Sequence, residues 1–293
     1  MTQAPSKAEA WNDFWRGQQG GCLPEASSSV DAAFRAQWHN FAATLPRGAK
    51  TLDLATGNAV VLRWLREARD DLELIGVDLA DALPEPPPGI VTRAGVALEA
   101  LPFADVSFDA AVSQFGFEYA DVEQGASEAA RVLRGGGMLS LVTHHAAGPI
   151  VAQNRRRATG LRWVLEEARL VDLARSQGAT APREVESYAR AAIERFGAGS
   201  AGWQLAEAIA QVSRNSRGVS DRQAAAMLDR LERMARGELQ RIGALEQASE
   251  AVAVEGWLET ILARHGFRLI EHARVTHAPD GLILADFRSF CRA

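Results

Sequence analysis

The chain has 293 residues and a formal net charge of -5 at pH 7, and this length favours one domain with a large insertion over two full domains. The acidic balance argues against a general nucleic-acid-binding protein. The two cysteines, Cys22 and Cys291, lie too far apart to indicate a disulfide framework or a metal site. No apolar run approaches the roughly 18 residues that a membrane span needs, so we expect no membrane span and a cytoplasmic protein.

The first predicted element is a helix over residues 30–45. Apolar side chains recur there at helical spacing, and Pro46 and Gly48 follow as stop signals. We expect this helix to pack against a core.

Strands and helices then alternate along the chain. Short apolar runs predict strands over 51–55, 72–79, 90–96, 109–115 and 138–144, and helical patterns over 59–70 and 126–133 lie between them. Alternation of this kind is typical of a parallel sheet.

The strand signal disappears from residue 146 to about residue 251, where several helices are predicted. The longest begins after Ser220 and places Leu228, Leu231, Ala235, Leu239 and Ile242 on one face. A helix over 256–265 and two strands joined by the turn "APDG" follow, and the two strands should form an antiparallel pair.

The stretch "TLDLATGNAVVLRWL" (51–65) predicts a strand, a small-residue turn and a helix, which is an arrangement that often holds a nucleotide-like ligand. A triphosphate loop is excluded because no Lys followed by Ser or Thr comes after Gly57. The three glycines of a dinucleotide fingerprint correspond to Ala55, Gly57 and Ala59, which is a poor match.

Two acidic residues flank this turn. Asp53 lies inside the first strand, where a carboxylate would repel a pyrophosphate and suits an ammonium group. Asp78 ends the second strand, 78 − 57 = 21 residues after Gly57, where a carboxylate can accept both hydroxyls of a ribose.

Four ordered segments carry a family resemblance: "LEALPFADVSFDAAVSQFGFEY", "ARVLRGGGMLSLVTH", "HGFRLIEHARVTH" and "LILADFRSF". Together they resemble class I S-adenosylmethionine-dependent methyltransferases, particularly the group that includes the ubiquinone and menaquinone biosynthesis methyltransferases. The resemblance implies an α/β fold with a Rossmann-like, mostly parallel sheet, an antiparallel C-terminal strand, helices on both faces and, in this chain, an all-helical insertion.

The resemblance implies S-adenosylmethionine as cofactor and S-adenosylhomocysteine as product. The cofactor-binding residues are predicted along the turn and the strand ends; they are Asp53, Ala55, Gly57, Asn58, Ala59, Asp78, Leu79, Val96, Ala97, Gln114 and Phe115. The chain departs from the family in having Ala55 and Ala59 in place of glycines, and in lacking the acidic residue that normally ends the third strand and contacts adenine.

Candidate residues on the acceptor side follow the fourth and fifth strands. His144 and His145 end the fifth strand and are candidate general bases, of which at most one can line the site because neighbouring strand residues point to opposite faces. Glu118, Tyr119, Trp11 and Trp15 are candidate substrate or lid residues. No metal is expected, and a base is required only if the methyl acceptor carries a proton on the attacking atom.

We therefore expect methyl transfer from S-adenosylmethionine to a small, partly apolar metabolite, with oxygen or carbon acceptors favoured. The expected domains are 1–48 (N-terminal helices and lid), 49–145 (cofactor-binding core), 146–251 (helical insertion and substrate cap) and 252–293 (C-terminal helix and antiparallel strands). A decayed binding or dimerisation module and an NAD-dependent oxidoreductase are the alternatives, a small-molecule acceptor is the expected partner, and a homodimer is left open.

Overall fold

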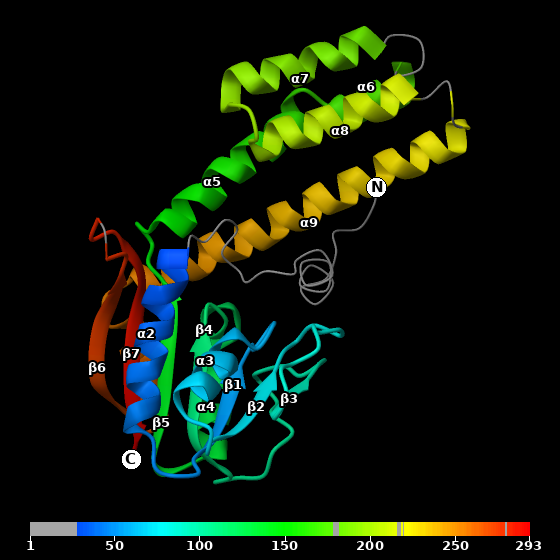
Figure 1. The fold of residues 1–293 in the computed structure, drawn as a ribbon. Coiled ribbons are helices and arrows are strands. Elements are labelled where there is room, and N and C mark those ends of the chain that lie inside the picture. Colours follow the sequence, from blue (N-terminus) through cyan, green and yellow to red (C-terminus); the bar gives the residue numbers. More distant parts are fainter. Residues whose placement is uncertain (1–27, 178–181, 216–217, 219, 279) are drawn as a thin grey trace. The chain divides into compact units, whose positions relative to one another are not determined.

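The computed structural model describes residues 28–177, 182–215, 218, 220–278 and 280–293 (Figure 1). The described chain divides into two compact units. One consists of residues 28–151 and 244–293 and contains the sheet, and the other consists of residues 152–243 and is helical.

A seven-stranded sheet forms the centre of the first unit. Its order is β3-β2-β1-β4-β5-β7-β6, with parallel pairing from β3 to β5 and antiparallel pairing of β7 with both β5 and β6. The strands are β1 (Lys50–Leu54), β2 (Glu73–Val77), β3 (Ile90–Arg93), β4 (Phe108–Gln114), β5 (Leu133–His144), β6 (Phe267–Thr276) and β7 (Ile283–Arg292). The predicted mostly parallel sheet with an antiparallel C-terminal strand is confirmed. The strand order reverses between β1 and β4, which is where open sheets of this type bind ligands at their carboxyl edge.

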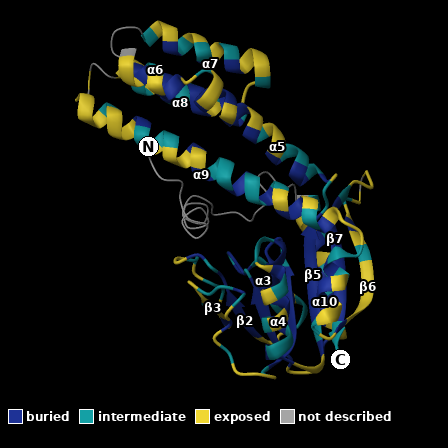
Figure 2. Ribbon diagram, turned by 180° about the vertical axis from the view of Figure 1, so that it is seen from behind, coloured by how far each residue is buried: buried dark blue, intermediate teal, exposed yellow. Residues whose placement is uncertain are grey.

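Helices cover both faces of this sheet. The helices α2 (Ser28–Thr44) and α3 (Val60–Ala68) contribute to one buried apolar cluster, and α4 (Val122–Val132) and α10 (Trp257–Arg264) contribute to the other. Figure 2 shows the central strands in the buried colour, whereas β6 at the sheet edge is largely exposed. Burial of a large apolar side chain stabilises a fold by about 1.5–3 kcal/mol. These two clusters therefore stabilise the packing of the helices on the sheet.

Two elements begin at least four residues before their predicted starts. The helix α4 begins at Val122 instead of Ala126, because the Asp121 side chain caps it by accepting a hydrogen bond from the Gln124 amide at 3.1 Å. The strand β5 begins at Leu133 instead of Met138, because the Gly135–Gly137 stretch stays in the strand as an irregularity in its register with β4.

The second unit is built from α-helices and one π-helical segment. Its elements are α5 (Pro149–Arg162), η2 (Trp163–Glu167), α6 (Leu170–Gln177), α7 (Pro182–Phe196), α8 (Ala201–Asn215) and α9 (Asp221–Ala253), with the first residues of α5 and the last of α9 belonging to the other unit. The predicted apolar face of α9 packs on the other helices of this unit: Leu228 and Ala235 are buried in its core, and Leu231 and Leu239 lie against them. Among the described helices, none is long and apolar enough to cross a membrane.

Candidate active site

The turn after β1 has a left-handed backbone. Its φ angles are 61° at Ala55, 52° at Gly57 and 57° at Ala59, and the Thr56 amide donates to the Val77 carbonyl at 2.9 Å, which ties the turn to β2. This conformation favours glycine and costs an alanine about 1–2 kcal/mol. The alanines that replace family glycines thus keep a glycine-like turn, and they do so under strain.

Asp53 lies at the floor of this turn and is 1% exposed. Its Oδ2 accepts a hydrogen bond from Thr56 Oγ1 at 2.7 Å, whereas its buried Oδ1 has no hydrogen-bond partner among the described residues. Burial raises the pKa of Asp53 to about 7; the hydrogen bond from Thr56 opposes this rise, and the charge of Asp78 adds to it. Oδ1 is therefore a vacant acceptor for a cationic or hydrogen-bond-donating ligand.

Asp78 follows β2 and links three segments of the site. Its Oδ2 accepts from the Gly57 amide at 2.9 Å and its Oδ1 accepts from the Ala80 amide at 2.9 Å, while the Val96 amide donates to the Asp78 carbonyl at 2.8 Å. Burial raises the pKa of Asp78, and the amides of Ala80 and Gly57 oppose that rise. A carboxylate has about four lone-pair positions, so both oxygens can also accept from ligand hydroxyls.

The end of β4 meets the same turn. A Cβ added at Gly116 would lie 2.4 Å from the Ala55 Cβ, so the glycine allows the two loops to touch. Gln114 Oε1 accepts a hydrogen bond from the Trp38 indole at 2.7 Å, and the Phe115 ring packs edge-on against Phe34 with centroids 5.4 Å apart. Gln114 and Phe115 thus lie at the predicted strand end, and both are engaged by α2.

His144 and Glu118 form a buried pair at the end of β5. Glu118 Oε1 accepts from both the His144 amide, at 3.1 Å, and His144 Nδ1, at 2.8 Å, and the Phe115 ring lies 4.3 Å from the imidazole centroid. The side chains of Glu118 and His144 are 1% and 5% exposed. The neighbouring His145 has a different partner, Asp286 on β7, at 2.8 Å from its Nδ1. The two histidines diverge, as the alternation of side chains along a strand predicts.

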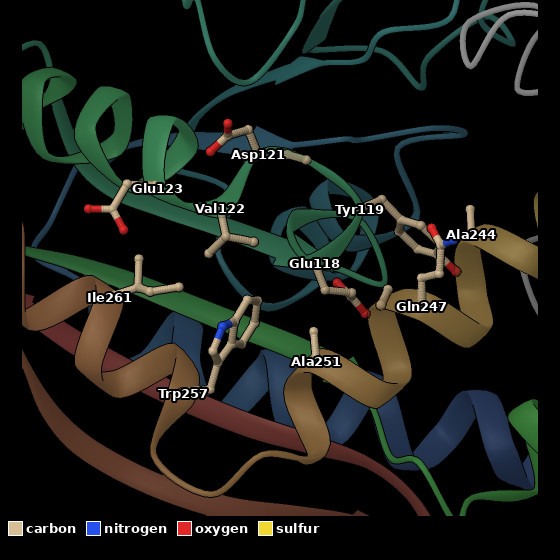
Figure 3. A pocket seen from close by; sticks show the side chains of 12 residues that line it. Glu118, Tyr119, Asp121, Val122, Glu123, Ala244, Gln247, Ala251, Trp257 and Ile261 are labelled. Carbon is tan, nitrogen blue, oxygen red and sulfur yellow. The ribbon is translucent and has the colours of Figure 1, made fainter.

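A pocket of about 410 Å³ adjoins this pair (Figure 3). It lies within the first unit, between the segment that follows β4 and the last turns of α9 with the start of α10. It is lined by Glu118, Tyr119, Ala120, Asp121, Val122, Glu123, Ala244, Gln247, Ala248, Ala251, Trp257 and Ile261. Glu118 is therefore the member of the buried pair that faces the pocket.

The structure brings together some of the predicted residues and leaves others unplaced. The half-buried Asn58, Leu79, Val96 and Ala97 lie in loops beside the two acids at the carboxyl edge of the sheet. Trp11 and Trp15 lie outside the described residues. The sequence did not connect Glu118 with His144, 26 residues apart, and it missed Thr56 and the Trp257 wall of the pocket.

One missed residue had a readable signal. Gly76 lies inside β2, where glycine is unfavourable unless another chain segment approaches closely. A Cβ at Gly76 would lie 2.5 Å from Thr56 Oγ1, the atom that binds Asp53. The glycine in the strand was thus a sign of the Thr56 position.

Comparison with known proteins assigns the centre of this unit to a family. Residues 52–141 match the family described as "Methyltransferase domain". Residues 52–141 are a methyltransferase domain. The matched segment includes Asp53, Asp78 and Glu118 and ends before His144, so the walls of the pocket that come from α9 and α10 lie outside it. The predicted resemblance to S-adenosylmethionine-dependent methyltransferases is confirmed.

One curated relative is similar to part of this chain. The ubiquinone/menaquinone biosynthesis C-methyltransferase of Geobacter sulfurreducens is 34% identical over 101 residues, which cover 31% of this chain and 40% of that protein. The chain thus spans about two fifths of the length of the curated relative that it matches.

Two solved structures are similar over most of both chains, at low sequence identity. A methyltransferase of Haloferax volcanii, in complex with the activator Trm112, is 14% identical with a TM-score of 0.46 over 98% of this chain and 99% of its own. An S-adenosylmethionine-dependent methyltransferase from Mesorhizobium loti is 16% identical with a TM-score of 0.44 over 88% of this chain and 98% of its own.

Proposed function

We propose that this protein transfers a methyl group from S-adenosylmethionine to a small, partly apolar acceptor, at an oxygen or a carbon atom. The observation that carries the proposal is the pair of buried acids around the turn after β1. Asp53 offers an acceptor oxygen without a protein donor among the described residues, and Asp78 is held by two backbone amides with lone pairs to spare.

The residues present fit S-adenosylmethionine. Asp53 Oδ1 suits the ammonium of the methionyl group, because a buried carboxylate without a donor is stabilised by a cation. Asp78 suits the ribose hydroxyls. Val96 and Ala97 carry no acidic side chain, which leaves backbone groups of their loop to contact the adenine. The φ angles of Ala55 and Ala59 lie in the left-handed region, so the turn keeps the backbone path that glycine favours in spite of the two methyl groups.

When bound, S-adenosylmethionine supplies an electrophilic methyl group on a sulfonium ion. The task of the protein is then to align the acceptor and to exclude water, since in-line transfer needs orientation more than it needs a catalytic side chain. Asp53 and Asp78 orient the donor at the β1 and β2 ends, and Phe115 and Tyr119 close the apolar side near His144.

Glu118 and His144 form the acidic side of the acceptor site in this proposal. Glu118 faces the pocket and is the residue that would contact the acceptor, whereas His144 holds its carboxylate through two hydrogen bonds and is a positioning residue. Glu118 thus presents an acidic group to the acceptor, with His144 behind it.

The helical segment 146–251 lies beyond the matched methyltransferase domain, and we propose that it determines acceptor specificity as a substrate cap. The end of α9 supports this role, because Gln247 and Ala251 line the pocket in the first unit. The burial of the α9 apolar face inside its own unit leaves that face unavailable to a second subunit.

Calorimetric titration tests the cofactor assignment. We expect heat on addition of S-adenosylhomocysteine to the full chain and none on addition of NADH at the same concentration. If only NADH gives a heat of binding, an oxidoreductase is favoured. If S-adenosylmethionine, S-adenosylhomocysteine and NADH all give no heat of binding, a decayed binding module is favoured.

A further inference from the structure

One carboxylate oxygen in the pocket beside α4 is buried without a protein donor. Glu118 Oε1 receives both hydrogen bonds from His144, and the buried Oε2 has no partner among the described residues. Figure 3 shows the Glu118 carboxylate directed into the space beside the α9 residues Gln247 and Ala251. A buried acceptor without a donor is costly, so a ligand group that donates to it is bound favourably.

Within the described chain, the lining of the pocket supplies no cation that would pair with Glu118 Oε2. None of the described residues that line the pocket is basic. Glu123 is paired outside the pocket with His265, at 2.9 Å, and with Arg264, at 3.3 Å. Asp121 is occupied in capping α4 and accepts from both the amide and the side chain of Gln124. Among these acids, Glu118 is thus the one with a carboxylate oxygen, Oε2, that remains available to a ligand.

The remaining walls suit an apolar body with a cation at one end. Trp257 and Tyr119 contribute aromatic rings, and Val122, Ala251 and Ile261 contribute small or branched apolar groups (Figure 3). Aromatic faces attract cations, and apolar walls bind hydrocarbon. Anionic groups are disfavoured, because they would face Glu118 in a setting of low dielectric constant.

We propose that this pocket binds the methyl acceptor through a positively charged nitrogen, with Glu118 Oε2 as the opposite charge. The inference rests on the proposed function, because it treats the pocket as the acceptor site of a methyltransferase. A protonated nitrogen has no lone pair, so the nitrogen anchors the acceptor and the methyl group goes to another atom of the same molecule. The acceptor class is therefore a small aromatic or aliphatic amine with a nucleophilic oxygen or carbon.

Three probes of one shape test this inference in the full chain with saturating S-adenosylhomocysteine. They are 2-phenylethylamine, 2-phenylethanol and 3-phenylpropionate, with binding followed by ligand-observed NMR. We expect the amine to bind at least about tenfold more tightly than the alcohol, and the carboxylate to bind most weakly. Equal affinities, a preference for the carboxylate, or no binding by any probe would overturn the proposal.

Two variants locate the preference. Glu118→Gln keeps the shape of the side chain and should remove the preference for the amine. The control Glu73→Gln, on an exposed acid that does not line the pocket and is paired with Lys50, should retain it. If Glu118→Gln does not fold, the three affinities of the wild-type protein decide the matter by themselves. S-adenosylhomocysteine binding is measured separately: its presence without amine preference refutes this inference alone, and its absence refutes the proposed function.

Discussion

Two buried acids in the first unit, Asp53 and Glu118, have the same local arrangement and different surroundings. Each has one oxygen in a short hydrogen bond, at 2.7 Å to Thr56 Oγ1 and at 2.8 Å to His144 Nδ1, and each has a second oxygen without a partner among the described residues. Asp53 lies in β1, just before the turn that leads to α3, whereas Glu118 lines a pocket with aromatic and apolar walls. We propose that an oxygen without a hydrogen-bond partner marks a ligand position in both places. In this proposal the surrounding walls distinguish the site of the methyl donor from the site of the methyl acceptor.

The largest effect we expect is the loss of cofactor affinity when Asp78, beside the turn after β1, is removed. In Asp78→Ala the Gly57 and Ala80 amides lose their hydrogen-bond acceptors. The ribose hydroxyls lose a negatively charged hydrogen-bond acceptor. Affinity for S-adenosylhomocysteine should fall by about 1–3 kcal/mol, or roughly 5-fold to 150-fold. Calorimetry on the folded variant, with circular dichroism as the check on folding, measures this loss; unchanged affinity would remove Asp78 from the site.

A smaller effect, with a pH signature, is expected at Asp53. Its carboxyl must be ionised to bind an ammonium group, and its pKa is about 7, so affinity for S-adenosylhomocysteine should rise by roughly tenfold between pH 6 and pH 7.5. Asp53→Asn should bind more weakly at pH 7.5 and lose that part of the pH dependence. Retention of the full pH dependence by the variant would assign the titration to another group.

The same pKa predicts how Asp53 affects the stability of the ligand-free protein. Because the folded-state pKa of about 7 lies above the ordinary aspartate value of 3.8, the folded protein holds more protons than the unfolded chain between about pH 4 and pH 7. The free energy of unfolding therefore falls as pH rises through this window, and Asp53→Asn should flatten the fall. Urea denaturation at pH 5 and pH 8 provides the comparison, and an equally steep fall in the variant would show that another group is responsible.

The smallest effect concerns the alanines of the turn. Ala59 has a φ of 57° at the start of α3, so Ala59→Gly relieves left-handed strain while making the unfolded chain more flexible. We expect the free energy of unfolding to rise by no more than about 1 kcal/mol, with cofactor affinity unchanged or slightly higher. A clear loss of stability would show that the methyl group of Ala59 packs favourably in its buried position.

Much of the predicted cofactor site around the turn after β1 could be predicted from the sequence, because the residue patterns that indicate it are local. Asp53, Gly57 and Asp78 lie at characteristic spacings around a strand and a turn, and the alternation of strands and helices determines the edge to which they belong. The bounds of α4 and β5 were shifted by a side-chain cap and by a strand irregularity, which a pattern of apolar residues does not reveal.

For the pocket beside Glu118, the sequence predicted single residues but not their arrangement. Glu118 and His144 were both singled out, but their pairing depends on the packing of the segment after β4 against the end of β5. The Trp257 wall comes from the start of α10, far beyond Glu118 in sequence, since 257 − 118 = 139 residues separate them. No local pattern connects positions so far apart.

A cross-titration of two variants with two ligands tests the separation of the two acids most directly. We predict that Asp53→Asn weakens S-adenosylhomocysteine binding and leaves the preference for 2-phenylethylamine over 2-phenylethanol intact. We predict that Glu118→Gln removes that preference and leaves S-adenosylhomocysteine affinity within about twofold. If each folded variant weakened both ligands to the same extent, or if neither variant changed either ligand, the two carboxylates would not mark separate donor and acceptor sites, which would contradict their assignment.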